Sequence, residues 1–135
     1  ETAIIPELDP DIPMTFVFCL VIVGDKYLLH YNPQREQWEH CAGGIEPNEH
    51  PDDTARREVF EESCQQVTNV QCLGILRLNF ARQKKIEYAP LYIAYLDELA
   101  PFTPNAESSE LLLWDENTPL DRPMGQLGYT ILKLV

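Results

Sequence analysis

Three glutamates, Glu58, Glu61 and Glu62, are spaced so that one turn of a helix would bring their carboxylates to the same side. A helix advances about 100° per residue, so Glu61 and Glu62 would lie roughly 60° and 40° to either side of Glu58. Like charges on one face repel each other, and hard divalent cations offset this repulsion because they prefer carboxylate oxygens. The spacing therefore indicates a cation site, with an acidic face exposed to solvent as the alternative.

Charge is unevenly distributed along the chain. The 135 residues hold 22 acidic and 10 basic side chains, a formal charge of −12, and residues 46–62 alone hold seven acids against two arginines. An acid excess disfavours nucleic-acid polymers and anionic membranes as partners, because both would approach a negative field. A small anionic substrate remains compatible with such a protein if divalent cations lie between the two.

The elements that must position the glutamates begin with a helix over about residues 51–64. Pro51 suits its first position, and Asp52 and Asp53 suit its first turn, where acids favour the helix dipole. A second helix is expected at residues 121–135, with Asp121 as its cap and Pro123 in its first turn.

Apolar segments bounded by turn residues predict the strands. These strands are expected at about residues 15–23, 26–31, 70–80, 86–96 and 110–114. We expect residues 1–135 to form a single domain in which residues 1–13 are an extended lead-in. The expected fold class is α/β in the broad sense, an α+β arrangement with helices packed on a mixed β-sheet.

A longer pattern surrounds the three glutamates and resembles the Nudix box, G-x5-E-x7-R-E-U-x-E-E-x-G-U, in which U is aliphatic. The matching residues are Gly43, Glu49, Arg57, Glu58, Val59, Glu61 and Glu62. The resemblance covers residues 43–65 closely, and the strands and tryptophans around the box extend it over most of the chain. Cys64 and Gln65 stand where the family has a glycine and an aliphatic residue. Because a glycine would cap the helix in the left-handed conformation, Cys64 predicts an altered or longer helix end.

The resemblance implies a Nudix-like mixed β-sheet sandwiched between helices and a hydrolase that uses Mg²⁺ or Mn²⁺. It implies that Glu58, Glu61 and Glu62 are metal ligands, helped by a backbone carbonyl near Gly43. Bound cations would neutralise the oxygens of a diphosphate bridge and generate hydroxide from water.

The resemblance also implies roles for other acidic and basic residues. Glu49 and Arg57 would form an ion pair that ties the loop to the helix, and both are counted with Glu61 and Glu62 as catalytic residues. Glu62 is the first choice for the general base. Glu107 and Glu110 are the alternatives.

Candidates for substrate contact lie outside the box. Four of the ten basic residues fall in the second hairpin and could receive phosphates, with solvated turn charges as the alternative: Arg77, Arg82, Lys84 and Lys85. Glu110 is counted with them. Four aromatic residues could stack on a base or could belong to the core: Phe16, Phe18, Phe80 and Tyr88.

The function expected from the resemblance is hydrolysis of a nucleoside diphosphate linked to another moiety, most closely of the nucleoside triphosphate type. Phe80-Ala81 and Arg82-Gln83 stand where ADP-ribose-type members have a proline and dinucleoside-polyphosphate-type members a tyrosine. Those two substrate classes remain alternatives, as does a Nudix-fold binding module without catalysis. The expected partner is a small nucleotide, bound by a monomer or homodimer.

The cysteines and histidines indicate neither a disulfide framework nor a zinc site. Cys19, Cys41, Cys64 and Cys72 form no CxxC pair, and His30, His40 and His50 lack zinc-like spacing. The longest apolar run, residues 16–23, is too short to span a bilayer and lacks the preceding basic residues of a signal peptide. Reduced thiols and a cytoplasmic location are therefore expected.

Overall fold

The computed structural model describes residues 2–5 and 12–135. Within these ranges the chain forms one eight-stranded sheet, two α-helices and a short 3₁₀ helix, η1 (Ala81–Gln83). The strands are β1 (Thr2–Ile5), β2 (Phe16–Val23), β3 (Lys26–Asn32), β4 (Gln37–Glu39), β5 (Cys41–Gly44), β6 (Gln71–Phe80), β7 (Lys85–Leu96) and β8 (Glu110–Trp114). The helices are α1 (Pro51–Ser63) and α2 (Gln126–Leu134).

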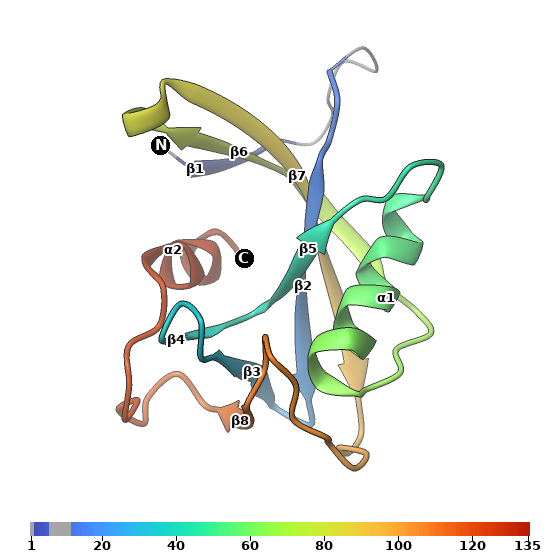
Figure 1. Ribbon diagram of the computed structural model, residues 1–135, viewed down its shortest axis with the longest axis vertical. Coiled ribbons are helices and arrows are strands. Elements are labelled where there is room, and N and C mark those ends of the chain that lie inside the picture. The colour runs from blue at the N-terminus through green and yellow to red at the C-terminus, as the bar shows by residue number, and fades with distance from the viewer. Residues whose placement is uncertain (1, 6–11) are drawn as a thin grey trace.

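Strand β2 is the centre of the sheet, whose order is β1-β6-β7-β2-β3-β4 (Figure 1). It runs parallel to β7 along one edge. Along its other edge β2 pairs first with β5 and then with β3, both antiparallel, so the sheet forks there. Strand β8 pairs with β3 on the far side. The mixed sheet expected from the sequence is confirmed, and all five expected strands agree with the observed ones to within one residue at each end.

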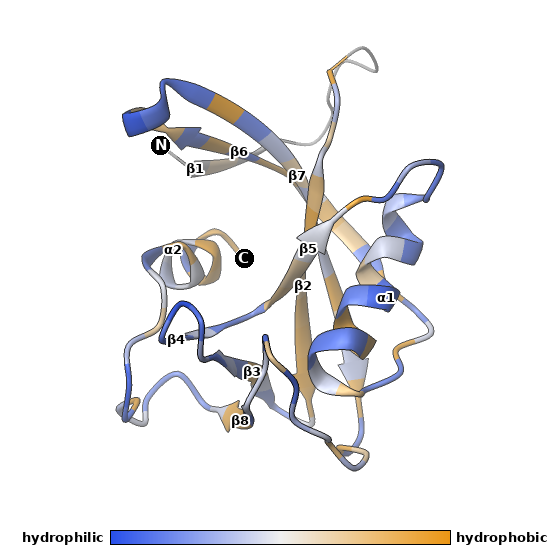
Figure 2. Ribbon diagram, viewed as in Figure 1, coloured by the Kyte–Doolittle hydropathy of each residue, from blue (hydrophilic) through white to orange (hydrophobic). Residues whose placement is uncertain are grey.

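The two helices cover opposite faces of this sheet (Figure 1). Side chains of β2 alternate between the faces. Val17, Cys19 and Val21 pack in one cluster with Ala55 and Val59 of α1. On the other face, Phe16, Phe18 and Leu20 pack in a second cluster with Ile131 of α2. Because both faces of β2 are buried, its sequence is a continuous apolar run, whereas α1 is largely hydrophilic away from the sheet (Figure 2).

Helix α1 begins as the sequence predicts, but its end differs. Pro51 is the first helical residue, and the His50 ring accepts a hydrogen bond from the Asp52 amide. At the other end the helix stops at Ser63, and Cys64 adopts the left-handed conformation (φ 63°) while its N–H donates to the Phe60 carbonyl. The expectation of an altered or longer end was therefore wrong, because Cys64 takes the conformation that a glycine would take.

Helix α2 is shorter than expected, because it begins at Gln126 after Gly125. The residues expected to start it contact Trp38 instead. The Trp38 indole donates to Asp121 at 3.0 Å, and the Trp38 amide donates to the Pro123 carbonyl at 2.8 Å. These contacts hold the segment before α2 against β4, so the prediction that Asp121 caps this helix was wrong.

Part of the expected N-terminal lead-in forms strand β1, which pairs antiparallel with β6. The rest of that prediction, at residues 1 and 6–11, lies outside the described residues. In the part of the chain that the structure describes, neither α-helix has the length and apolar character needed to cross a membrane.

Candidate active site

Arg57 connects the loop between β5 and α1 to the helix. Its Nε donates to Glu49 Oε2 at 2.8 Å, and its Nη2 donates to Glu49 Oε1 at 2.9 Å and to the Gly44 carbonyl at 2.8 Å. The Arg57 guanidinium lowers the pKa of Glu49 to about 2, helped by the Thr54 hydroxyl. The ion pair expected between Glu49 and Arg57 is thus present, and it fixes the path of the loop over the first turns of α1.

The same guanidinium also contacts the glutamates of the helix. Arg57 Nη1 donates to Glu58 at 2.7 Å and lies 3.2 Å from a Glu61 oxygen. The Glu61 side chain is half exposed, whereas the Glu58 side chain is largely buried. Arg57 therefore neutralises part of the repulsion between these two carboxylates.

The Glu58 carboxyl group lies directly over Gly43. A Cβ atom added to Gly43 would collide with the Glu58 carboxyl group, so the position requires a glycine while Glu58 keeps this conformation. Burial raises the pKa of Glu58 above its usual value, although the Arg57 guanidinium acts in the opposite direction. The glycine of the box therefore makes room for one of its carboxylates.

Glu62 is the most buried of the three glutamates. Its Oε1 accepts a hydrogen bond from the Ala42 amide at 2.9 Å, and its Oε2 lies 3.6 Å from Nε2 of His30. Burial raises the pKa of Glu62 to about 9. A nearby cation would oppose this rise, because positive charge favours the ionised carboxylate.

The three box glutamates do not converge on one point. Within the described residues, no group of three His, Cys, Asp or Glu side chains lies close enough to hold a metal ion. Glu58 and Glu62 face adjacent residues of β5, and Arg57 lies between Glu58 and Glu61. The donors are hard carboxylate oxygens beside a backbone strand, which suit Mg²⁺ or Mn²⁺. A cation shared by Glu58 and Glu61 would replace their contacts with Arg57.

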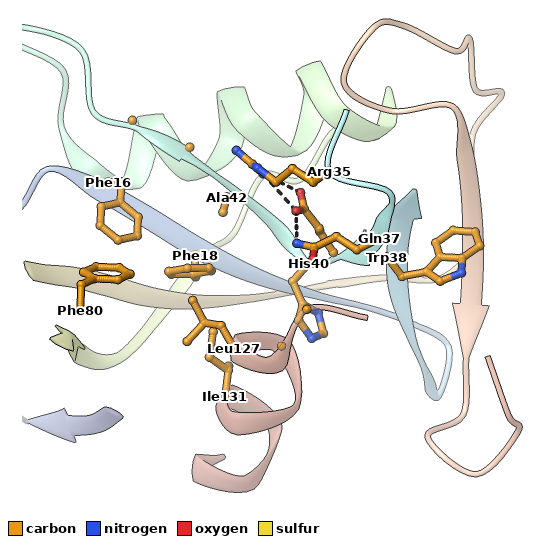
Figure 3. Close-up of a pocket in the computed structure, with 15 residues that line it drawn as sticks. Phe16, Phe18, Arg35, Gln37, Trp38, His40, Ala42, Phe80, Leu127 and Ile131 are labelled. Carbon is orange, nitrogen blue, oxygen red and sulfur yellow. Dashed lines mark hydrogen bonds and ion pairs between the residues drawn. The ribbon is translucent and has the colours of Figure 1, made fainter. Parts of the chain in front are cut away.

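A cavity of about 460 Å³ lies between the sheet and α2, a volume typical of small-molecule sites. Its apolar lining includes Phe16, Phe18, Phe80, Leu127 and Ile131, and Figure 3 shows the three phenylalanines close together. Its polar lining includes Arg35, Gln37, Glu39 and His40. Gly43 and Gly44 also line the cavity, so it reaches the strand against which Glu58 packs.

The residues expected to contact substrate divide into two groups. Phe16, Phe18 and Phe80 line the cavity, whereas Tyr88 is not among the described residues that do so. The basic residues Arg77, Arg82, Lys84 and Lys85 also lie outside this lining. Glu110 accepts a hydrogen bond from Arg122 at 2.6 Å and lines a separate hollow of about 320 Å³ beside β8.

Sequence reasoning missed a polar cluster around Glu39 at the cavity. Arg35 Nη1 donates to both Glu39 oxygens at 2.9 and 3.0 Å, Gln37 donates at 2.6 Å and Asn32 at 3.2 Å. Strand β4 has only three residues, too few to show an alternating pattern. Arg35, Gln37 and Glu39 lie shortly before Gly43 in the sequence, and this closeness to the box is the signal that could have pointed to them.

Comparisons with known proteins agree with this fold. A family model for the NUDIX domain matches residues 14–124. No curated protein sequence matches the chain. Among solved structures, the MutT NUDIX hydrolase of Burkholderia pseudomallei has a TM-score of 0.74 at 17% identity, covering 91% of this chain and 98% of that one.

Two further structures are similar in fold. A mutant form of the Bacillus subtilis pyrophosphohydrolase BsRppH has a TM-score of 0.70 at 23% identity, covering 89% of this chain and 74% of that one. The NUDIX domain of Shewanella oneidensis NrtR, complexed with ADP ribose, has a TM-score of 0.74 at 16% identity, covering 95% of this chain and 91% of that one.

The fold and the glutamate-bearing helix define a protein of the α–β–α sandwich class with an acidic loop–helix site. Because the family model covers most of the chain, the protein belongs to the Nudix family of pyrophosphohydrolases. Members of this family generally use divalent metal ions and act on small nucleotide substrates.

Proposed function

We propose that this protein hydrolyses, with Mg²⁺ or Mn²⁺, a nucleoside diphosphate linked to another moiety, and that its substrates are of the nucleoside triphosphate type. One observation carries the proposal. Gly43 packs against the Glu58 carboxylate and also lines the aromatic cavity. A base bound among the phenylalanines would thus have its phosphates beside the acidic helix.

In this proposal Glu58, Glu61, Glu62 and the Gly43 carbonyl hold the cation. A bound Mg²⁺ supplies charge neutralisation of the phosphate oxygens and acidifies water. Glu62 is the proposed general base, because it is the most buried of the three carboxylates and a bound cation, by opposing the rise in its pKa, would keep it ionised. Glu107 is the alternative, since its charge raises the pKa of both Glu58 and Glu62.

Glu49 and Arg57 have a structural part in the proposed site. Arg57 binds Glu49 and the Gly44 carbonyl at the same time, which holds the loop against the helix that carries the glutamates. Their proposed role is to orient the carboxylates of this helix, a task that needs the planar fork of an arginine.

Arg35 is the side chain that we propose contacts the phosphates of the substrate. It is the single Lys or Arg among the described residues that line the cavity, and two thirds of its side chain is exposed. Its guanidinium can therefore exchange the Glu39 carboxylate for a phosphate oxygen. The hairpin residues Lys84 and Lys85 have weaker support, because they lie outside the cavity lining.

An assay that separates the nucleotide products by chromatography, run over a nucleotide panel, tests the proposal. The panel holds nucleoside triphosphates, ADP-ribose and dinucleoside polyphosphates, each with Mg²⁺, with Mn²⁺ and with chelator. We expect cation-dependent cleavage by the wild type, loss of cleavage in Glu62→Gln, and wild-type cleavage in Glu98→Gln, which changes an exposed acid of the loop after β7. Absence of cleavage, together with no cation-dependent rise in melting temperature, would reject the enzyme hypothesis.

A non-catalytic binding module is the second candidate, because Arg57 already neutralises Glu58 and Glu61 without a cation. In that case a ligand of the panel would raise the melting temperature at the same concentration with and without Mg²⁺, and no ligand would be cleaved. The same samples therefore distinguish the two candidates.

A further inference from the structure

His30 of β3 is a fully buried histidine beside the box helix. Both of its ring nitrogens lie out of contact with water and have no side-chain hydrogen-bond partner among the described residues, and the backbone of His40 and of Glu107 approaches the ring without good hydrogen-bond geometry. Buried polar atoms without partners are rare and costly in native proteins. Position 30 would otherwise suit an apolar residue such as its neighbours Leu28 and Leu29, so the histidine needs an explanation.

The carboxylate that faces His30 is that of Glu62, whose Oε2 lies 3.6 Å from His30 Nε2. Glu39 is opposite His30 in the β3–β4 ladder, but its carboxylate already accepts hydrogen bonds from Arg35, Gln37 and Asn32. Among the described residues, Glu62 has a donor on one oxygen only, the Ala42 amide at Oε1. The free oxygen of Glu62 and the free nitrogen of His30 therefore face each other.

Residues of two strands lie on either side of the Glu62 carboxylate. Strand β5 supplies the Ala42 amide and strand β3 supplies the His30 ring, and both strands pair with the same edge of β2 at the fork. Ligands of metal ions are commonly oriented by such outer hydrogen bonds. A shift of a few tenths of an ångström brings Nε2 and Oε2 within hydrogen-bond distance.

We propose that His30 is a positioning residue for Glu62, whose Oε2 accepts a hydrogen bond from His30 Nε2–H when Glu62 ligates the divalent cation. With Ala42 on Oε1 and His30 on Oε2, the carboxylate is held from both sides, and one lone pair remains on each oxygen, one for the ion and one to accept a proton. This inference rests on the proposed metal-binding role of Glu62.

Three substitutions at position 30 and a Mn²⁺ titration followed by electron paramagnetic resonance test the inference without turnover. A glutamine can place its amide nitrogen near the position of Nε2, an asparagine only near that of Nδ1, and a leucine has no donor. We expect His30→Leu and His30→Asn to raise the Kd for Mn²⁺ about tenfold and His30→Gln to raise it less than about threefold.

His40→Leu is the matched control. His40 is also buried with both ring nitrogens unpartnered, but it lies beside the Tyr27 ring, and no ion pair joins it to the box glutamates in the described part of the chain. We expect this variant to keep the wild-type Kd for Mn²⁺, and it serves as a control for metal binding only, because His40 lines the cavity in which the nucleotide is proposed to bind. In the nucleotide assay, His30→Leu should lower kcat while the KM for nucleotide stays near that of the wild type.

The outcomes separate this inference from the proposed function. If wild type binds Mn²⁺ and folded His30→Leu binds it equally well, the positioning role is overturned and the metal site stands. If His30→Leu fails to fold, equal Kd values for His30→Gln and His30→Asn overturn the inference. If wild type and Glu62→Gln bind Mn²⁺ equally weakly, the metal-binding role of Glu62 fails, and the role of His30 fails with it.

Discussion

At the scale of single residues, a substitution at Gly43 should affect catalysis and metal binding much more than stability. A Cβ at this position collides with the end of the Glu58 side chain, which can rotate away, and not with backbone. We expect Gly43→Ala to change the free energy of unfolding by less than about 1 kcal/mol. Because it displaces a proposed metal ligand, it should lower kcat/KM by about 10²-fold and weaken Mn²⁺ binding.

Gly44→Ala is the control for this substitution. A Cβ at Gly44 would have the Thr15 carbonyl oxygen as its nearest neighbour, at 3.9 Å, which is an ordinary contact. Its Mn²⁺ affinity should therefore match that of the wild type. Equal affinities for the two alanine variants would show that the position of Glu58 over Gly43 has no bearing on the metal site.

Two adjacent arginines provide a second comparison at this scale. Arg57 binds Glu49 through two nitrogens, whereas Arg56 contacts Asp53 and the Thr68 carbonyl on the other side of the helix. A lysine cannot reproduce the planar fork. We expect Arg57→Lys to lower kcat/KM at least about tenfold and to speed proteolysis of residues 44–50, because the loop loses its bidentate tie. Arg56→Lys should leave both measurements near those of the wild type.

At the scale of elements, the end of α1 stores a small strain. Cys64 has a φ of 63°, a conformation that costs a non-glycine residue about 1 kcal/mol. We expect Cys64→Gly to be more stable than Cys64→Ala by about that amount in urea unfolding, since both variants lose the contacts of the Cys64 thiol with the Thr103 backbone. Equal stabilities would mean that the strain is relieved elsewhere.

The sequence predicts the elements that have a local signal well and those without one poorly. Strand β8 and the start of α1 have local signals, namely a bounded apolar run and the Pro51-Asp52 pair. Strands β4 and β5 are too short to have a period. The predicted start of α2 was wrong because Asp121 and Pro123 satisfy the local rules for a helix start. In the structure both instead accept hydrogen bonds from Trp38, more than eighty residues away in the sequence.

The candidate site was predictable to a similar degree. The box has fixed spacing, so Glu49, Arg57 and the three glutamates could be named from the sequence. Phe16, Phe18 and Phe80 could be named as candidates for stacking on a base, but their meeting with Leu127 in one cavity could not be predicted, because these residues come from distant parts of the chain and meet only once the sheet has formed. The same holds for the approach of His30 to Glu62, since nothing local links β3 to the last turn of α1.

At the scale of the whole molecule, the free energy of unfolding should depend on pH through His40. Burial lowers the pKa of this histidine to about 4, against about 6.5 for an unfolded chain. The unfolded state therefore takes up a proton first as the pH falls. The stability contributed by neutral His40 is complete above about pH 6.5, declines by about 3 kcal/mol down to about pH 4 and is constant below that.

Urea unfolding of wild type and His40→Leu between about pH 7.5 and pH 4 checks this expectation. Other groups that titrate in this range, Glu62 among them, are common to both proteins and cancel in the difference. We expect the variant to lose about 3 kcal/mol less than the wild type over this interval. Parallel pH profiles would show that His40 is protonated without loss of the fold.

The alternation of side chains along β2 also bears on how such a protein can change over generations. Val17, Cys19 and Val21 pack beneath the acidic helix, whereas Phe16 and Phe18, which alternate with them, face the cavity on the opposite side of the sheet. A substitution at Phe16 or Phe18 can change the shape of the cavity without moving the helix that carries the carboxylates. Substitutions on the cavity-facing side of β2 can therefore change substrate preference over evolution while the packing beneath the glutamate-bearing helix stays the same.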